Sequence, residues 1–200
     1  MPAKNEDLHG NAPDKSDTAL LLIDVINDLE FPEADGLLEA AVPAAERIFK
    51  LKRRAKQADV PVVYVNDNFG RWQSNFRAQI DHCLNDGVRG EPIARLLEPD
   101  EDDYFVLKPK HSGFFSTTLE VLLKYLGART VICTGIAGDI CVLFTANDAF
   151  LRDLHVVVPD DCIASNTPED NEHALKVMRK VLKADTRPSA EIEFPYRAQW

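Results

Sequence analysis

The sequence predicts a three-layer α/β/α sandwich built on a mostly parallel sheet of about six strands. From residue 18 onward, short apolar runs typical of strands alternate with longer amphipathic runs typical of helices. The apolar runs are continuous, as in strands that are covered on both faces. This alternation indicates parallel strands joined by crossover helices, so we expect ligands to bind beyond the carboxyl ends of the strands.

The first half of the chain predicts three strands and one long helix. The strands are residues 19–23, 61–65 and 104–107. Asp24 directly follows the first strand, and Lys108 directly follows the third. A helix is predicted over residues 37–58, because basic residues in its last turns complement the negative end of a helix dipole. Residues 69–103 lack a clear period, so we expect short helices and loops there.

The second half predicts three more strands and three helices. The strands are residues 130–134, 155–158 and 190–194. Thr117 and Glu120 have the spacing of a capping box, which predicts a helix that ends at Gly127. After the fourth strand, a turn of small residues leads into a helix expected to begin near Cys141 and to end near residue 153. The last helix is predicted to start at residue 167, where a Thr precedes a Pro.

Length and charge limit the kind of protein this is. The 200 residues suit one domain, which we place at residues 18–200 after a flexible polar tail of residues 1–17. The net charge of −10 argues against binding to nucleic acid. The chain has no apolar run long enough to cross a bilayer, and its start lacks the apolar core of a signal peptide. We therefore expect a cytoplasmic protein that does not bind a membrane.

The four cysteines are too few and too irregularly spaced for a disulfide framework in a chain of this length. The sequence also has no CxxC pair, so a structural zinc site is not expected. The thiols are therefore expected to be reduced, and Cys141 is the one with a context that favours reactivity.

Three residues at or just beyond strand ends form a candidate catalytic site: Asp24, Lys108 and Cys141. A thiol at a helix N-terminus is favoured as the thiolate, and unpaired N–H groups there can hold an oxyanion. A buried carboxylate, as Asp24 would be at a strand end, costs free energy unless it is paired. A lysine at position 108, placed between Asp24 and Cys141, would stabilise both the carboxylate and the thiolate. Each residue alone has a simpler explanation: a buried small thiol, a turn-capping carboxylate and a solvated lysine.

Three segments carry a family resemblance: residues 21–28 (LLIDVIND), 106–109 (VLKP) and 134–142 (TGIAGDICV). They resemble the catalytic Asp, Lys and Cys segments of the isochorismatase-like hydrolases. That family includes nicotinamidases, N-carbamoylsarcosine amidases, ureidoacrylate hydrolases and isochorismatases. The resemblance extends over roughly residues 18–194. It implies a cysteine hydrolase that cleaves a small amide, carbamoyl or related acyl substrate, needs no cofactor and forms a homo-oligomer.

The resemblance also implies a role for each residue. Asp24 would take the thiol proton and later give it to the leaving amine. Cys141 would attack the carbonyl to give a thioester that water hydrolyses, while Lys108 would hold the carboxylate and the thiolate. The N–H groups of Ala137 and Cys141 would form the oxyanion hole, with a cis peptide bond before Ala137.

The candidate substrate-binding residues are aromatic, polar and apolar side chains near the same strand ends. They are Phe31, Asn66, Asp67, Phe69, Trp72, Phe114 and Ile136. The aromatic side chains suit a core equally well, and the polar cluster suits a turn. No motif names the substrate.

No metal site is expected from the sequence. Nicotinamidases in the family carry an Asp-x-His metal motif after the second strand. The corresponding residues here, 67–69, read Asp-Asn-Phe and offer no histidine, and the nearest candidate is His82.

Four alternatives remain open at this stage. The first is an isochorismatase-type ether hydrolase in which Cys141 is incidental. The second is a non-catalytic binding protein on the same fold. The third is a phosphoacceptor receiver domain, whose first strand also ends in Asp, although it does not explain residues 134–142. The fourth pairs Cys141 with His111, as in papain-like enzymes.

Overall fold

The computed structural model describes residues 12, 14–69 and 75–196. Six parallel strands form one sheet in the order β3-β2-β1-β4-β5, and β6 pairs with the end of β4. The strands are β1 (Thr18–Ile23), β2 (Val62–Asp67), β3 (Tyr104–Lys108), β4 (Thr130–Ile136), β5 (His155–Val157) and β6 (Ile163–Ala164). The α-helices are α1 (Ala34–Gln57), α2 (Phe76–Asn85), α3 (Glu91–Leu96), α4 (Leu119–Leu126), α5 (Leu143–Phe150) and α6 (Pro168–Lys180).

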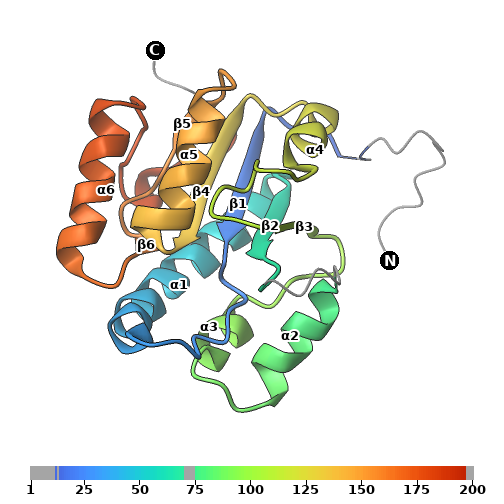
Figure 1. The fold of residues 1–200 in the computed structure, drawn as a ribbon. Coiled ribbons are helices and arrows are strands. Elements are labelled where there is room, and N and C mark those ends of the chain that lie inside the picture. The colour runs from blue at the N-terminus through green and yellow to red at the C-terminus, as the bar shows by residue number, and fades with distance from the viewer. Residues whose placement is uncertain (1–11, 13, 70–74, 197–200) are drawn as a thin grey trace.

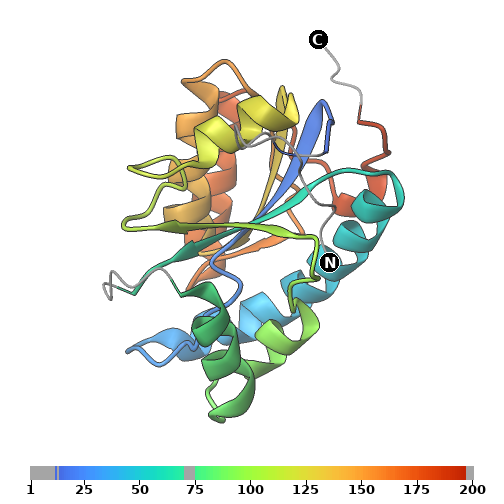
Figure 2. The same cartoon turned by 90° about the vertical axis from the view of Figure 1, so that its right-hand side faces the viewer.

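Helices cover both faces of this sheet, which confirms the predicted three-layer fold. Helices α4, α5 and α6 lie on one face, and α1 with α2 and α3 lies on the other (Figures 1 and 2). A separate apolar core fills each interface between sheet and helices. The central strand β1 is buried along its whole length between β2 and β4. Burial on both faces explains why its sequence is a continuous apolar run.

The predicted sixth strand at residues 190–194 is wrong. A 3-10 turn, Ser189–Glu191, begins this segment, and the sixth strand is β6 instead. The Arg54 guanidinium donates hydrogen bonds to the carbonyls of Ser189 and Ile192. Those carbonyls therefore have partners without joining a sheet, while the apolar Ile192 side chain is still buried.

The predicted capping box of α4 does not form. The helix begins at Leu119, and its N-cap residue makes no side-chain capping bond. The Thr117 hydroxyl donates to the Gly113 carbonyl, and Glu120 pairs with Lys124 and Arg152 on the surface. Gly127 ends the helix in the left-handed conformation, as predicted.

The residues just before β1 contact the body of the protein. Tyr104 donates a hydrogen bond to the Asp14 carboxylate, Ser16 N–H donates to the Leu126 carbonyl, and Asp17 O accepts from Thr130 N–H. Residues 1–11 and 13 lie outside the described part, so the tail expected over residues 1–17 stays a prediction. In that part, no helix is both long and apolar enough to cross a membrane.

Candidate active site

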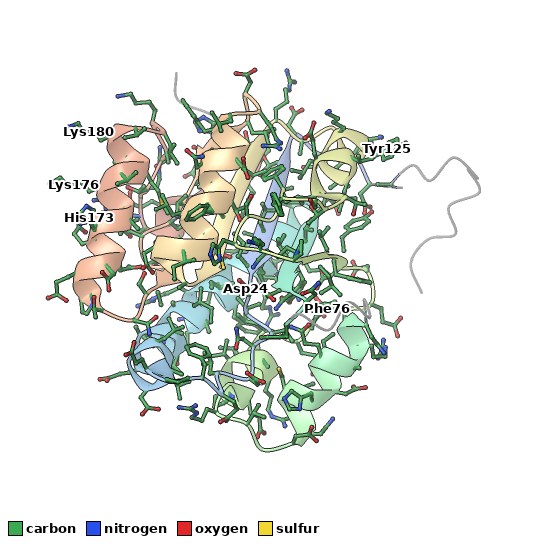
Figure 3. The ribbon with its side chains drawn as sticks, viewed as in Figure 1. Asp24, Phe76, Tyr125, His173, Lys176 and Lys180 are labelled. Atoms are coloured by element: carbon green, nitrogen blue, oxygen red, sulfur yellow. The ribbon has the colours of Figure 1, made fainter. Side chains whose placement is uncertain are left out.

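Four neighbouring strands bring polar side chains to one edge of the sheet. Asp24 directly follows β1, Asp67 ends β2, Lys108 ends β3, and Cys141 lies in the turn after β4. These strands are adjacent and parallel, so their carboxyl ends meet. Figure 3 shows Asp24 beyond the arrowhead of β1, at the end of the sheet near α2, where Phe76 is also labelled.

Lys108 lies at the centre of this group. Its side chain is 0% exposed, and its Nζ is 2.8 Å from Asp24 Oδ2 and 3.5 Å from Asp67 Oδ2. The same ammonium donates to Cys141 Sγ at 3.4 Å. The Asp24 carboxylate is also hydrogen-bonded to the Cys141 thiol. The structure therefore brings together the three residues that the sequence selected and adds Asp67 to them.

The Asp24 carboxylate is held through both of its oxygens. Oδ1 accepts the Asp67 backbone N–H at 2.7 Å, while Oδ2 faces Lys108. The Asp24 N–H donates to the Val65 carbonyl at 3.0 Å, which extends the β1–β2 pairing past the end of β1. Asp24 has a φ of 52°, in the left-handed region that Asp tolerates better than most residues. The backbone thus turns at the point where the side chain must face the site.

Cys141 lies in a π-helical turn, η1 (Gly138–Val142), and the α-helix expected near Cys141 starts two residues later, at Leu143. π-Turns of this kind are frequent at functional sites. The Cys141 carbonyl accepts a hydrogen bond from the Thr145 hydroxyl at 2.7 Å. The turn is also anchored to the segment after β6, because the Asp139 N–H donates to Ser165 Oγ at 3.1 Å.

The close approach of β4 to β1 requires glycine at the entry to this turn. Gly135 has a φ of 117°, and a Cβ there would lie 2.0 Å from the Ile23 carbonyl oxygen. The peptide bond between Ile136 and Ala137 is cis. Within the described residues, the Ala137 N–H donates no hydrogen bond, while the Ala137 carbonyl accepts from Val142 N–H at 3.1 Å.

Burial shifts the pKa values of Asp24, Cys141 and Lys108. Burial raises the pKa of Asp24, and the nearby Lys108 charge only partly opposes this. Burial also raises the pKa of Cys141, and the Asp24 charge adds to the increase, while Lys108 opposes it. For Lys108, burial disfavours the charged form, but Asp24 and Cys141 more than compensate and the pKa rises. Burial and the Asp24 charge thus favour the thiol form of Cys141, whereas the helix N-terminus was expected to favour the thiolate.

The polar candidates for the substrate pocket occupy two different environments. Asn66 is completely buried, and its Nδ2 donates to the Ile26 carbonyl at 2.8 Å, while its Oδ1 has no hydrogen-bond partner. Asp67 faces Lys108, with its other oxygen accepting the Phe69 N–H at 2.7 Å.

The apolar candidates for the substrate pocket are of two kinds, partly exposed and buried. Phe31 and Phe69 are 36% and 41% exposed, as expected of side chains available to a ligand. Phe114, in contrast, is buried in the core between the sheet and α4–α6, with the Arg152 guanidinium over its ring. Ile136 is likewise buried in the opposite core. Trp72 lies outside the described residues.

The two histidines considered from the sequence make other contacts. His82 on α2 lies between two carboxylates, with Nδ1 2.6 Å from Asp86 and Nε2 3.3 Å from Asp28. The His111 ring packs against Phe144, with ring centroids 5.4 Å apart.

One acidic group among the described residues has the spacing to hold a metal ion: Asp100, Asp102 and Asp103. Lys52 and Lys56 already pair with these carboxylates. These side chains precede β3, so they lie at the end of the sheet opposite Lys108.

Sequence reasoning assigned Asp67 to the substrate and missed its contact with Lys108. The signal was present, because Asp67 ends a strand in the same way as Lys108 does. It also missed Ser165, which accepts a hydrogen bond from the Asp139 N–H in η1 and donates one to Asn171 Oδ1 at 3.1 Å. Nothing in the local sequence of Ser165 marks that contact.

Comparison with known proteins gives consistent matches. The family model described as an isochorismatase domain matches residues 18–186. YaaI of Bacillus subtilis, described as an uncharacterized isochorismatase family protein, is 44% identical over 178 residues, which cover 89% of this chain and 97% of YaaI. Ureidoacrylate amidohydrolase RutB of Methylorubrum extorquens is 26% identical over 204 residues, covering 88% of this chain and 80% of RutB. The crystal structure of N-carbamoylsarcosine amidase from Thermoplasma acidophilum is similar with a TM-score of 0.68 and 28% identity, over 88% of this chain and 98% of that chain.

Proposed function

Because this chain belongs to the isochorismatase family, whose members include amidohydrolases, we propose that it is a cysteine hydrolase acting on a small amide, carbamoyl or related acyl substrate. The observation that carries the proposal is the buried contact of Lys108 with both Asp24 and Cys141. A thiol, a base in hydrogen-bond contact with it and a fixed cation are the parts that nucleophilic acyl transfer requires.

In the first half of the reaction, Asp24 takes the proton of the Cys141 thiol, with which it is already hydrogen-bonded. The sulfur then attacks the substrate carbonyl carbon, and negative charge develops on the carbonyl oxygen. The N–H groups of Ala137 and Cys141 are the proposed donors to that oxygen. The raised pKa of Asp24 suits this role, because a more basic carboxylate is a better proton acceptor.

In the second half, the carbon–nitrogen bond breaks and Asp24 gives its proton to the leaving nitrogen. This leaves a thioester on Cys141. Asp24 then takes a proton from water, whose oxygen attacks the thioester carbon, and the acid product departs as the sulfur regains a proton. Lys108 stays charged throughout and stabilises whichever neighbour, Asp24 or Cys141, is the anion.

Phe31 and Phe69 are the proposed apolar contacts for a small substrate, because both are partly exposed aromatic side chains on loops near this edge of the sheet. As further proposals from the family, the protein is a cytoplasmic homo-oligomer with one domain over residues 18–200. Light scattering coupled to gel filtration tests the oligomer, since a monomer mass would contradict it.

Release of amine or ammonia from a panel of small amides and carbamoyl compounds tests the function. Cys141→Ala should abolish turnover, because it removes the sulfur on which the proposed thioester forms. The matched control is Cys83→Ala, which removes a buried thiol on α2 and should leave turnover unchanged. Turnover of the amides by Cys141→Ala at the wild-type rate would refute a covalent mechanism, and hydrolysis of a vinyl ether alone would favour the ether-hydrolase alternative.

A further inference from the structure

Three acceptors surround the Lys108 ammonium, which has three N–H donors to place. Asp24 Oδ2 is at 2.8 Å, Cys141 Sγ at 3.4 Å and Asp67 Oδ2 at 3.5 Å. The Lys108 side chain is 0% exposed, so these three protein groups surround the ammonium in place of bulk solvent. The proposed mechanism uses Asp24 and Cys141 and leaves the Asp67 contact without a role.

Asp67 touches both members of the buried ion pair. Its backbone N–H donates to Asp24 Oδ1 at 2.7 Å, and its carboxylate faces Lys108. The side chain of Asp67 is 33% exposed, so this carboxylate is better solvated than that of Asp24, which is 6% exposed.

We propose that Asp67 is a positioning residue for the proposed reaction, which holds the Lys108 ammonium between two carboxylates and shares its positive charge with Asp24. This inference rests on the proposed function for its purpose, but the contacts do not depend on it. The charged and titratable groups contacting Lys108 are Asp24 after β1, Asp67 at the end of β2 and Cys141 after β4. With one cation and two carboxylates, the site has a net charge of −1 while Cys141 is a thiol.

Sharing of the Lys108 charge between Asp24 and Asp67 affects how readily Asp24 and Cys141 release their protons. If Asp67 lost its charge, Lys108 would act on Asp24 and Cys141 alone, and both groups would release their protons at lower pH. Asp24 would then be a weaker base toward the thiol and a weaker general base toward water. Asp67 thus keeps Asp24 basic while Lys108 remains charged.

A simpler role for Asp67 is to cap the turn at residues 67–69, since Oδ1 accepts the Phe69 N–H at 2.7 Å. Asparagine caps such turns as well as aspartate does. Asp67→Asn therefore separates the two roles: it keeps the cap and removes the charge that faces Lys108. Asp67→Glu keeps the charge and alters the cap.

The test is the rate at which iodoacetamide alkylates Cys141 in the full chain, measured against pH by mass spectrometry of the Cys141 peptide. This measurement needs no substrate, so it is valid even if no amide is turned over and the proposed function fails. In Asp67→Asn the profile should move to lower pH by about 0.5–1 unit, which makes alkylation roughly 3–10-fold faster below the midpoint. Asp67→Glu should stay within a few tenths of a unit of wild type.

Asp35→Asn is the control for the change in net charge, because Asp35 is 90% exposed and pairs with Arg89 instead. Its profile should overlay that of the wild type. Superimposed profiles for Asp67→Asn and wild type would overturn the proposal and leave turn capping as the role. An equal shift in Asp67→Glu would overturn it too. If Asp67→Asn does not fold, Asp67→Ser makes the same comparison, because a serine hydroxyl can also cap the turn.

If amides are turned over, the acidic limb of kcat/KM in Asp67→Asn should move to lower pH and the plateau should fall by about tenfold, as expected of a weaker base. A role confined to turn stability would lower the plateau without moving the limb.

Discussion

Replacing Lys108 with Met tests the buried ion pair most severely. The change keeps most of the side-chain volume and removes the charge 2.8 Å from Asp24 Oδ2. Asp24 is 5% exposed, so its carboxylate would remain buried without a counter-charge. Removing one partner of such a pair costs about 3–5 kcal/mol. That is a large share of the roughly 5–15 kcal/mol that stabilises an ordinary domain, so we expect a fall in Tm of about 6–20 °C.

The loss should depend on pH in a definite direction. Without Lys108, the pKa of Asp24 in the folded protein would rise further above its unfolded value. The protonated carboxyl carries no charge, so the penalty vanishes below the unfolded pKa and grows as pH rises toward the folded pKa. Lys108→Met should therefore be closest to wild type in acid and furthest from it at neutral pH.

Urea unfolding followed by circular dichroism at pH 5 and pH 7 measures the free energy of unfolding of Lys108→Met and wild type. Adding Asp24→Asn to Lys108→Met should recover much of the lost free energy of unfolding, because it removes the buried carboxylate that has no counter-charge. Lys124→Met is the matched control: its ammonium is 73% exposed and pairs with Glu120 on the surface, so the cost should stay below about 1 kcal/mol. Equal stability of Lys108→Met and wild type at pH 7, with no recovery in the double variant, would refute the reasoning.

Three more predictions concern the site. At neutral pH, Cys141 should alkylate faster than the other three cysteines, because it alone is partly exposed; peptide mapping after iodoacetamide treatment measures this, and equal rates would contradict it. Gly138→Ala places a Cβ 2.5 Å from Asn171 Oδ1 and should displace η1, the turn that contains Cys141. We expect kcat to fall at least about tenfold and stability to fall by about 1–3 kcal/mol; unchanged kinetics would show that the turn tolerates the added methyl group. The kcat/KM of the wild type should rise with pH through an acidic limb above the ordinary carboxyl range, because the pKa of Asp24 is raised and only its carboxylate accepts the thiol proton; a limb at or below that range would argue against Asp24 as the base.

The sequence was informative where one physical rule acts alone. The apolar run of β1 predicted a buried strand, because burial on both faces leaves no polar position. The parallel sheet then predicted that Asp24 and Lys108 would meet, because the carboxyl ends of parallel strands gather at one edge.

Other features depend on contacts that local sequence does not record. Ile192 is buried, but its carbonyl and that of Ser189 accept hydrogen bonds from Arg54 instead of from a neighbouring strand, and apolar content alone cannot separate these outcomes. Strand β6 has 2 residues, too few for a periodic signal. The helix N-terminus suggested a thiolate at Cys141, whereas burial and the Asp24 charge raise the pKa of that thiol.

A covalent mechanism on Cys141 is tested most directly by looking for the acyl group on its sulfur during turnover. The protein is mixed with an amide that it hydrolyses, quenched with acid within one turnover, and digested for mass spectrometry. The proposed mechanism predicts that the Cys141 peptide gains the mass of the acyl group, that the adduct disappears as the substrate is exhausted, and that Asp24→Asn does not accumulate it. Turnover with no adduct at any quench time, together with full activity of Cys141→Ala, would contradict it.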